Sequence, residues 1–217
     1  MSGGKPFMRQ FVLGLTGSIG MGKSAVAAML RDLDVPVFDA DAAVHELQGP
    51  DGACLAAIER AFPGATGPLG VDRQKLGAAV FGDSDKLKLL ESIVHPEVAE
   101  MRRAFLADNA DAPLIVFDIP LLFEKTGQHG LNAVAVVSAP AEVQRERVLS
   151  RAGMSAEKFA NILALQVPDA DKRSRADFVI DTGVPLTQTR TQVAALIAHL
   201  LENGAWPHLP AAPGASI

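Results

Sequence analysis

The segment from Gly17 to Ser24 has the residue types and the spacing of a phosphate-binding loop. It reads Gly-Ser-Ile-Gly-Met-Gly-Lys-Ser and fits the P-loop pattern G-x-x-x-x-G-K-[ST] at every fixed position. Glycines let a backbone turn tightly and bring its N–H groups close to phosphate oxygens. Lys23 adds a full positive charge, and Ser24 offers a hydroxyl to Mg²⁺. The pattern therefore predicts binding of a nucleoside triphosphate together with Mg²⁺.

The residues on either side of this loop have the context that the motif requires. Residues 11–16 form a short apolar run suited to a buried strand, and residues 25–33 have apolar residues at helical spacing. The order strand, glycine loop, helix places the positive end of the helix and its unpaired N–H groups at the anion. This order disfavours the alternative interpretation, a glycine-rich turn without a ligand.

Four more apolar runs each end at or just before a polar residue. They are residues 35–38, 114–117, 133–137 and 178–180, followed by Asp39, Asp118, Ser138 and Asp181. Alternation of such runs with helical patterns predicts an α/β fold of the P-loop NTPase type, with a parallel five-stranded sheet flanked by helices. Ligands of such sheets bind beyond the carboxyl ends of the strands, where these polar residues stand.

Two intervals are too long or too charged to be simple crossovers. Residues 40–111 predict a helical substrate-binding insertion, with helices at 42–48, 52–61, 73–81, 84–94 and 96–109 and with His95-Pro96 between the last two. Residues 144–175 hold five arginines and two lysines, which predicts a helical lid, although a solvated face is the alternative for any single arginine. The nucleotide-binding core then comprises residues 9–39, 112–143 and 176–203, between flexible tails at 1–8 and 204–217.

Carboxylates at two strand ends are candidates for chemistry. Asp39 can accept or orient the proton of an attacking hydroxyl, and the alternative role for a carboxylate here is the N-cap of the next helix. Asp41 is a candidate for that cap, and Asp39 is favoured for chemistry because it stands directly at the strand end. Asp118 follows an apolar run as in a Walker B arrangement and is a candidate indirect Mg²⁺ ligand. The apolar residues 121–123 that come next either line a substrate groove or belong to the core.

Composition limits the possible functions. The chain has 217 residues and a net charge of -5, which argues against general nucleic-acid binding. A single cysteine, Cys54, excludes an internal disulfide and favours the cytoplasm. The sequence has neither a signal-peptide layout nor an apolar run of about eighteen residues, so no membrane association is expected. We expect a monomer or a weak homo-oligomer.

Among P-loop proteins, a small-molecule kinase fits this chain best. Regulatory GTPases use D-x-x-G and N-K-x-D, and neither pattern occurs here. The length, the helical insertion and the arginine-rich interval suit a kinase. Two alternatives stay open: a kinase for a nucleoside, nucleotide or shikimate-like acceptor, and a nucleotide-binding regulator without an acceptor.

From about residue 11 to residue 203 the chain resembles the dephospho-CoA kinases. The resemblance rests on residues 15–24, 39–41, 93–96 and 118–124, and on Gln144 to Arg147, Arg151, Gln166 and residues 176–181 in and after the predicted lid. The segment Pro-Leu-Leu-Phe-Glu and the His-Pro pair, in this order, are the specific part. The resemblance implies transfer of the γ-phosphate of ATP to the ribose 3′-hydroxyl of dephospho-CoA, the last step of coenzyme A synthesis.

The resemblance also assigns roles to residues. Catalysis is expected from Asp39, Lys23 and Arg147, and Mg²⁺ binding from Ser24 and Asp118. ATP binding is expected from Gly17, Ser18, Ile19, Gly20, Met21, Gly22, Lys23, Ser24, Ala25, Arg147 and Arg151. Binding of dephospho-CoA is expected from Asp39, His95, Pro120, Leu121, Leu122 and Glu124. The chain departs from the family at Asn161, where many members have Arg, and at Thr182, where members often have Asn.

Overall fold

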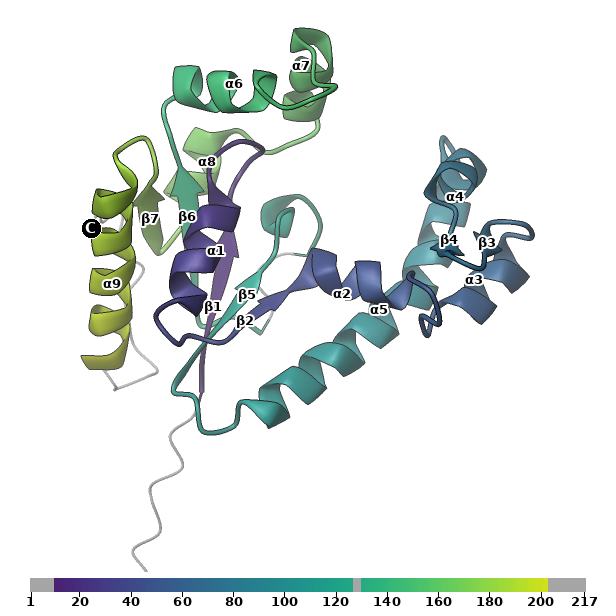
Figure 1. Cartoon of the computed structure of the whole chain (residues 1–217), viewed down its shortest axis with the longest axis horizontal. Helices are drawn as coiled ribbons and strands as arrows, with labels where there is room; N and C mark the ends of the chain where they lie inside the picture. Colours follow the sequence, from purple (N-terminus) through teal and green to yellow (C-terminus); the bar gives the residue numbers. More distant parts are fainter. Residues whose placement is uncertain (1–9, 127–129, 203–217) are drawn as a thin grey trace, which may run out of the picture. The chain divides into compact units, whose positions relative to one another are not determined.

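The five apolar runs form one sheet in the computed structural model, which describes residues 10–126 and 130–202. The strands are β1 (Phe11–Thr16), β2 (Val37–Asp39), β5 (Leu114–Asp118), β6 (Ala133–Ser138) and β7 (Phe178–Asp181), in the order β2-β5-β1-β6-β7 (Figure 1). β1 pairs in parallel with β5 and β6, and β6 pairs in parallel with β7. The predicted parallel five-stranded sheet is confirmed. The predicted tails, 1–8 and 204–217, lie outside the described residues.

The sheet belongs to the first of two units into which the chain divides. The first unit comprises residues up to Phe38 and from Asn109 onward, and the second comprises Asp39–Asp108. The helices of the first unit are α1 (Lys23–Arg31), the π-helical turn η1 (Leu122–Thr126), α6 (Ala141–Leu149), α7 (Ala156–Ala164), α8 (Asp169–Ser174) and α9 (Leu186–Glu202).

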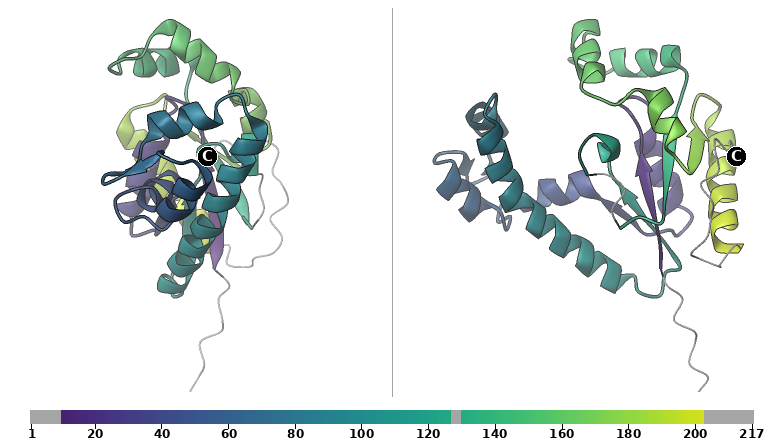
Figure 2. Two further views of the ribbon diagram at one scale, coloured as in Figure 1. Left: turned by 90° about the vertical axis from the view of Figure 1, so that its right-hand side faces the viewer. Right: turned by 180° about the vertical axis from the view of Figure 1, so that it is seen from behind.

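Both faces of the sheet are covered. In β6, Ala135 and Val137 point into a cluster with α1 and α9, whereas Val134 and Val136 point into a second cluster with Leu122 and the residues near α8. The two further views place α8 on the side of the sheet away from α1 (Figure 2). Burial on both faces explains why the strands are continuously apolar rather than alternating.

The strand order creates one place where neighbouring connections diverge. The chain leaves β1 through α1 toward β2, while it leaves β6 through α6 toward β7 on the opposite edge. In open parallel sheets, ligands bind beyond the carboxyl ends of the strands at such a divergence. The topology therefore directs attention to the residues that follow β1 and β6.

The second unit is helical with a small hairpin. It contains α2 (Ala40–Leu47), α3 (Leu55–Ala61), β3 (Thr66–Gly67), β4 (Gly70–Val71), α4 (Arg73–Val80) and α5 (Ser84–Asp108). Its own core is a cluster of buried residues, Leu47, Cys54, Ile58, Phe62, Ala65, Leu76 and Val94. The predicted helices at 42–48, 52–61 and 73–81 are found with small shifts of their ends. The hairpin was not predicted, because strands of two residues leave no periodic pattern.

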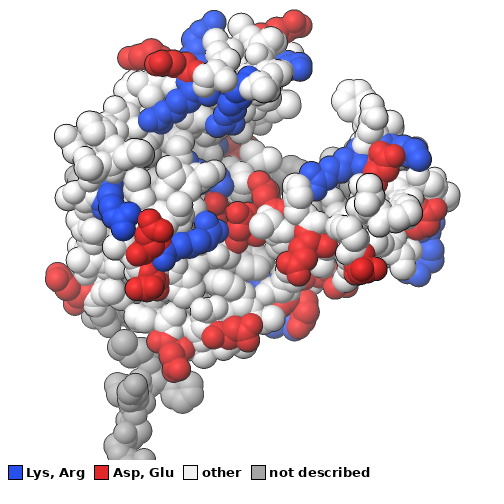
Figure 3. Space-filling model, viewed as in Figure 1, with Lys and Arg blue, Asp and Glu red and all other residues white. Residues whose placement is uncertain are grey.

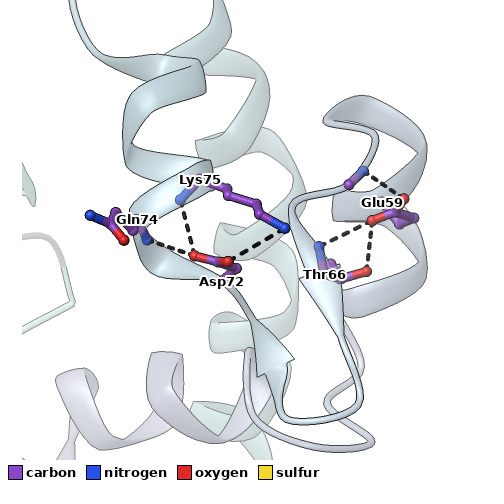
Figure 4. A network of polar contacts seen from close by, with 6 residues as sticks. Glu59, Thr66, Asp72, Gln74 and Lys75 are labelled. Carbon is purple, nitrogen blue, oxygen red and sulfur yellow. Dashed lines mark hydrogen bonds and ion pairs between the residues drawn. The ribbon is translucent and has the colours of Figure 1, made fainter.

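Two carboxylates fix the hairpin between α3 and α4 (Figure 4). Glu59 accepts hydrogen bonds from the N–H of Gly64 at 2.7 Å and from the N–H and hydroxyl of Thr66 at 3.1 and 2.7 Å. Asp72 caps α4 by accepting from the N–H groups of Gln74 and Lys75, both at 3.1 Å. These bonds lower the pKa of both carboxyls, with the Gly64 N–H the main cause for Glu59 and the Lys75 N–H for Asp72.

One prediction about the second unit was wrong. The two helices expected at 84–94 and 96–109 are a single helix, α5, which continues through Pro96. Proline removes one i→i−4 hydrogen bond, and its ring crowds the preceding turn, so a break was the expected outcome. Packing of α5 against α2, α3 and α4 holds the helix together across the proline. None of the helices in residues 10–126 and 130–202 is both long and apolar enough to cross a bilayer.

Replacing Pro96 should therefore stabilise the second unit. The Pro96 side chain is exposed, so Pro96→Ala loses little packing and restores a helical hydrogen bond. We expect the free energy of unfolding to rise by about 1–3 kcal/mol in urea titrations. Glu100→Ala, at another exposed position of α5, is the control and should change it by less than about 0.5 kcal/mol. A loss of stability in Pro96→Ala would contradict this account.

Candidate functional site

The loop between β1 and α1 has a backbone that only glycine adopts easily. Gly20 has φ 79° and Gly22 has φ 87°, both in the left-handed region. A Cβ at Gly20 would lie 2.5 Å from Val148 Cγ2, and one at Gly17 would lie 2.8 Å from the carbonyl oxygen of Val137. The two glycines that the pattern fixes, Gly17 and Gly22, are therefore required by a close neighbour and by backbone conformation, and Gly20, at a variable position of the pattern, is required by both.

Lys23 at the start of α1 and Asp118 at the end of β5 form an ion pair. Lys23 begins α1 and pairs with Asp118 Oδ1, while Asp118 ends β5 directly beside Leu15 of β1. The Asp118 side chain is only 3% exposed, and that of Lys23 is 17% exposed. The sheet register thus brings the two predicted residues together, and the carboxylate orients the ammonium group at the mouth of the loop.

The oxygen atoms near this pair suit a hard divalent cation. Ser24 lies in the first turn of α1 with an exposed side chain, and Ala25 follows it. A hydroxyl and a carboxylate are the kinds of ligand that Mg²⁺ takes from protein, and it draws its remaining ligands from phosphates and water. Ser24 and Asp118 therefore fit the predicted magnesium site in chemical type.

Two glutamines of the predicted lid (residues 144–175) hold one residue of the loop. Gln144 Nε2 donates to the carbonyl oxygen of Ile19 at 2.7 Å, and the N–H of Ile19 donates to Gln166 Oε1 at 3.1 Å. Gln144 is buried in α6, and Gln166 follows α7. Both polar backbone groups of Ile19 are thus satisfied by side chains of this segment, one from α6 and one from the turn after α7. Sequence reasoning listed these glutamines only as part of the family resemblance.

Arg147 contacts Thr182 from α6. Its Nη1 donates to Thr182 Oγ1 at 3.1 Å, and its Nη2 donates to the Thr182 carbonyl oxygen at 2.6 Å. Arg151 and Asn161 have exposed side chains. The structure therefore brings Arg147 to the loop through Thr182, a residue noted in the sequence only as a departure from the family. The position of Thr182, directly after the last strand, is the signal that could have marked it.

The lid also holds charges of both signs. In the space-filling view, Lys and Arg atoms gather over the α6 and α7 end of the first unit, with acidic atoms beside them (Figure 3). The exposed arginines there include Arg145 and Arg151, and Glu142 and Glu146 are exposed on the same helix as Arg145. A surface with charges of both signs can offer arginines to a phosphate group without carrying a large positive charge overall.

Glu124 forms a buried ion pair rather than facing outward. Its Oε1 lies 2.7 Å from Lys172 Nζ and accepts from the N–H of Val167 at 2.9 Å. The Lys172 side chain has no exposed surface, and that of Glu124 is 9% exposed. Burial acts to raise the pKa of Glu124, but the contacts with Lys172 and Val167 outweigh it, so the pKa lies below its ordinary value of 4.5. The pair ties η1 to α8.

Of the predicted binding residues just before Glu124 in the chain, one is buried in the core and two are partly exposed. Leu122 is fully buried in the cluster that covers one face of the sheet. Pro120 and Leu121 are half-buried, and the carbonyl oxygen of Pro120 accepts from the hydroxyl of Thr16 at 3.2 Å. Of the residues predicted to bind the acceptor in this segment, Pro120 and Leu121 retain surface for contact, whereas Leu122 has none.

Two predicted residues belong to the second unit. Asp39, the last residue of β2, is the N-cap of α2, and its Oδ1 accepts from the N–H of Ala42 at 2.9 Å. Asp41 therefore does not take the cap position and lies exposed in the first turn. His95 is exposed on α5. The cap occupies one oxygen of Asp39, so capping and chemistry are compatible roles for this carboxylate.

Comparison with known proteins gives one consistent result. The family model described as dephospho-CoA kinase matches residues 11–187. The chain is 68% identical to the dephospho-CoA kinase of Novosphingobium aromaticivorans, over 90% of this chain and 97% of that protein. It is 51% identical to the dephospho-CoA kinase of Bradyrhizobium diazoefficiens, over 88% and 96%.

Two solved structures are also similar to this chain in fold and in sequence. The crystal structure of TT1252 from Thermus thermophilus is 36% identical, with a TM-score of 0.78, over 88% of this chain and 98% of that chain. Dephospho-CoA kinase from Campylobacter jejuni is 25% identical, with a TM-score of 0.58, over 88% and 97%. The chain thus matches these proteins along nearly the whole of their length.

The lowered pKa of Glu124 gives its ion pair a defined pH dependence. A carboxyl with a lowered folded-state pKa stabilises the fold above its ordinary value of 4.5, and this contribution is lost as pH falls through the lowered value. We expect Glu124→Gln to cost about 3–5 kcal/mol at pH 7, because Lys172 is left buried without its counter-charge. The difference from the wild type should narrow below pH 4.5 in urea titrations.

The control for this prediction is Glu142→Gln, which removes an exposed carboxylate from α6. It should change stability by less than about 0.5 kcal/mol at every pH. A Glu124→Gln deficit of the same size at pH 7 and at pH 3.5, or a deficit no larger than that of the control, would contradict the assignment.

Proposed function

The chain belongs to the dephospho-CoA kinase family, and we propose that it transfers the γ-phosphate of ATP to the ribose 3′-hydroxyl of dephospho-CoA. The products are CoA and ADP, and the reaction is the final step of coenzyme A biosynthesis. The observation that carries the proposal is the glycine loop with the Lys23–Asp118 pair at its mouth, in a chain that matches the family model over residues 11–187.

The P-loop holds the donor phosphates in this proposal. The amides of residues 17–25 bind phosphate oxygens at the N-terminus of α1, and the Lys23 ammonium lies by the β- and γ-phosphates. The ion pair with Asp118 keeps the lysine side chain directed at the loop. An ammonium group has three N–H donors, so donors remain for phosphate oxygens. Ser24, and Asp118 indirectly, would hold Mg²⁺, which would neutralise charge on the phosphates.

The lid supplies further positive charge. Arg147 and Arg151 lie over the phosphates in the closed enzyme and neutralise charge that builds on the transferring group. Exclusion of water by the lid protects the transfer from hydrolysis. Arg147 is half-buried and held by two hydrogen bonds, whereas Arg151 is exposed, which supports the stronger role for Arg147.

Asp39 orients the acceptor hydroxyl and accepts its proton. The residue ends β2, at the carboxyl edge of the sheet, where ligands of such folds bind. Catalysis of phosphoryl transfer depends more on positioning the reacting groups than on covalent chemistry by the protein, so one carboxylate within reach of the acceptor hydroxyl suffices. His95, Pro120 and Leu121 are proposed to contact dephospho-CoA, with Leu122 and Glu124 supporting this segment from within.

The domain roles follow the same proposal. Residues 40–111 bind dephospho-CoA, residues 144–175 act as the lid, and residues 9–39, 112–143 and 176–203 bind ATP. We propose that the enzyme works in the cytoplasm as a monomer or a weak homo-oligomer, without nucleic acid as a partner. The reduced state expected for Cys54, the single cysteine, supports that compartment.

The decisive assay measures ADP release with ATP, Mg²⁺ and dephospho-CoA. AMP, uridine and shikimate serve as parallel acceptors. We expect release with dephospho-CoA alone and a product that behaves as CoA. Lys23→Ala should lower kcat by about 10²-fold or more with the fold intact, since it removes a charge at the transferring phosphate. Release with another acceptor only, or a Lys23→Ala enzyme with normal turnover, would overturn the proposal.

Asp39→Asn separates chemistry from capping. Asparagine caps a helix as well as aspartate, so the melting temperature should stay within a few degrees of the wild type. We expect kcat to fall by about 10²–10⁴-fold, because the amide cannot take a proton, with a smaller change in KM for ATP. Asp39→Ala should lose the same activity and also about 1 kcal/mol of stability. Normal turnover of Asp39→Asn would leave capping as the role of Asp39.

A further inference from the structure

Thr182 joins three separate parts of the first unit. Its hydroxyl donates to the carbonyl oxygen of Met21 at 2.6 Å and lies 3.3 Å from that of Ser138, whereas the hydroxyl oxygen accepts from Arg147 Nη1 at 3.1 Å. Its backbone N–H donates to Ser138 O at 2.8 Å. The side chain is 5% exposed. One small residue thus links the P-loop, the end of β6 and helix α6.

The bond to Met21 fixes the P-loop two residues before Lys23. Met21 is buried, and the N–H of Ala139 lies 3.2 Å from its sulfur. Gly22 packs so closely that a Cβ there would lie 3.0 Å from Thr182 Oγ1. The carbonyl, the side chain and the next residue of the loop are therefore all held, which sets the backbone that leads into Lys23.

The bonds to Arg147 fix the guanidinium in one orientation. Two of its nitrogens donate to the same residue, one to the hydroxyl and one to the carbonyl oxygen of Thr182. Arginine loses little further freedom once such a fork is formed, so its remaining N–H groups keep a set direction. The hydroxyl of Thr182 is thereby the shared partner of the loop and of the arginine.

We propose that Thr182 is a positioning residue for phosphoryl transfer, which sets the P-loop and Arg147 relative to each other. The inference rests on the proposed roles of the P-loop and Arg147. Threonine suits this place because one hydroxyl donates to Met21 and accepts from Arg147 at once. Valine has nearly the same shape but can neither donate nor accept a hydrogen bond. Thr182→Val therefore tests the contribution of the hydroxyl separately from that of side-chain packing.

The experiment compares Thr182→Val with Thr182→Ser, which keeps the hydroxyl. Thr189→Val is the matched control: Thr189 is 1% exposed, and its hydroxyl donates to the carbonyl oxygen of Asp181 at 3.1 Å. Within the described residues its hydrogen bonds reach neither the loop nor Arg147. Steady-state kinetics give kcat and KM for ATP. We expect kcat/KM for ATP to fall about tenfold to hundredfold in Thr182→Val, since hydrogen bonds to a charged group are lost. Thr182→Ser and Thr189→Val should stay within about threefold of the wild type.

A double-mutant cycle distinguishes positioning from general weakening of the fold. If Thr182 acts through Arg147, Thr182→Val costs markedly less in the Arg147→Ala background than in the wild type. Equal losses in both backgrounds, or an equal loss in Thr189→Val, would overturn the inference. Normal turnover of Arg147→Ala would overturn the proposed role of Arg147 itself, which is a separate result. Should Thr182→Val not fold, Arg147→Lys replaces it: loss of the fork should cost nearly as much kcat as Arg147→Ala, and lysine working as well as arginine would refute the proposal.

Discussion

The conformation of the loop between β1 and α1 is the constraint on which the first unit depends. Left-handed backbone at Gly20 and Gly22 lets the loop turn tightly, but glycines alone leave a chain flexible. The loop is held from outside: Val137 crowds Gly17, Gln144 and Gln166 satisfy Ile19, and Thr182 binds Met21. These neighbours hold the loop in one conformation. In the proposed reaction the loop dipoles would then need no rearrangement, which is the advantage of preorganisation.

In the part of the chain that the structure describes, the first unit holds two ion pairs of low exposure, and they serve different purposes. Lys23 with Asp118 is partly open, so the lysine can still meet an incoming anion. Lys172 with Glu124 is almost entirely closed and ties η1 to α8. A buried pair is costly to form and contributes little net stability against an apolar substitute, but it strongly disfavours any other arrangement of its elements. The pair of Lys172 with Glu124 therefore fixes α8, which leads back into the sheet at β7, against η1.

The contacts of the lid show why a departure from the family need not weaken the site. Asn161 stands where many members have arginine, and it lies exposed on α7. Thr182 stands where members often have asparagine, and it holds both Met21 and Arg147. A short hydroxyl side chain is sufficient here because β6, β7 and α6 meet at this point and leave little room.

The sequence by itself determined the elements whose signals are local. The P-loop, the parallel sheet and most helices follow from glycine spacing, apolar runs and helical periodicity, which depend on neighbours within a few residues. Tertiary structure alone decided that α5 continues through Pro96, that Glu124 pairs with Lys172, and that Thr182 reaches a loop 161 residues earlier in the chain. Such contacts join segments distant in sequence, and their energies depend on burial and packing that no local pattern encodes.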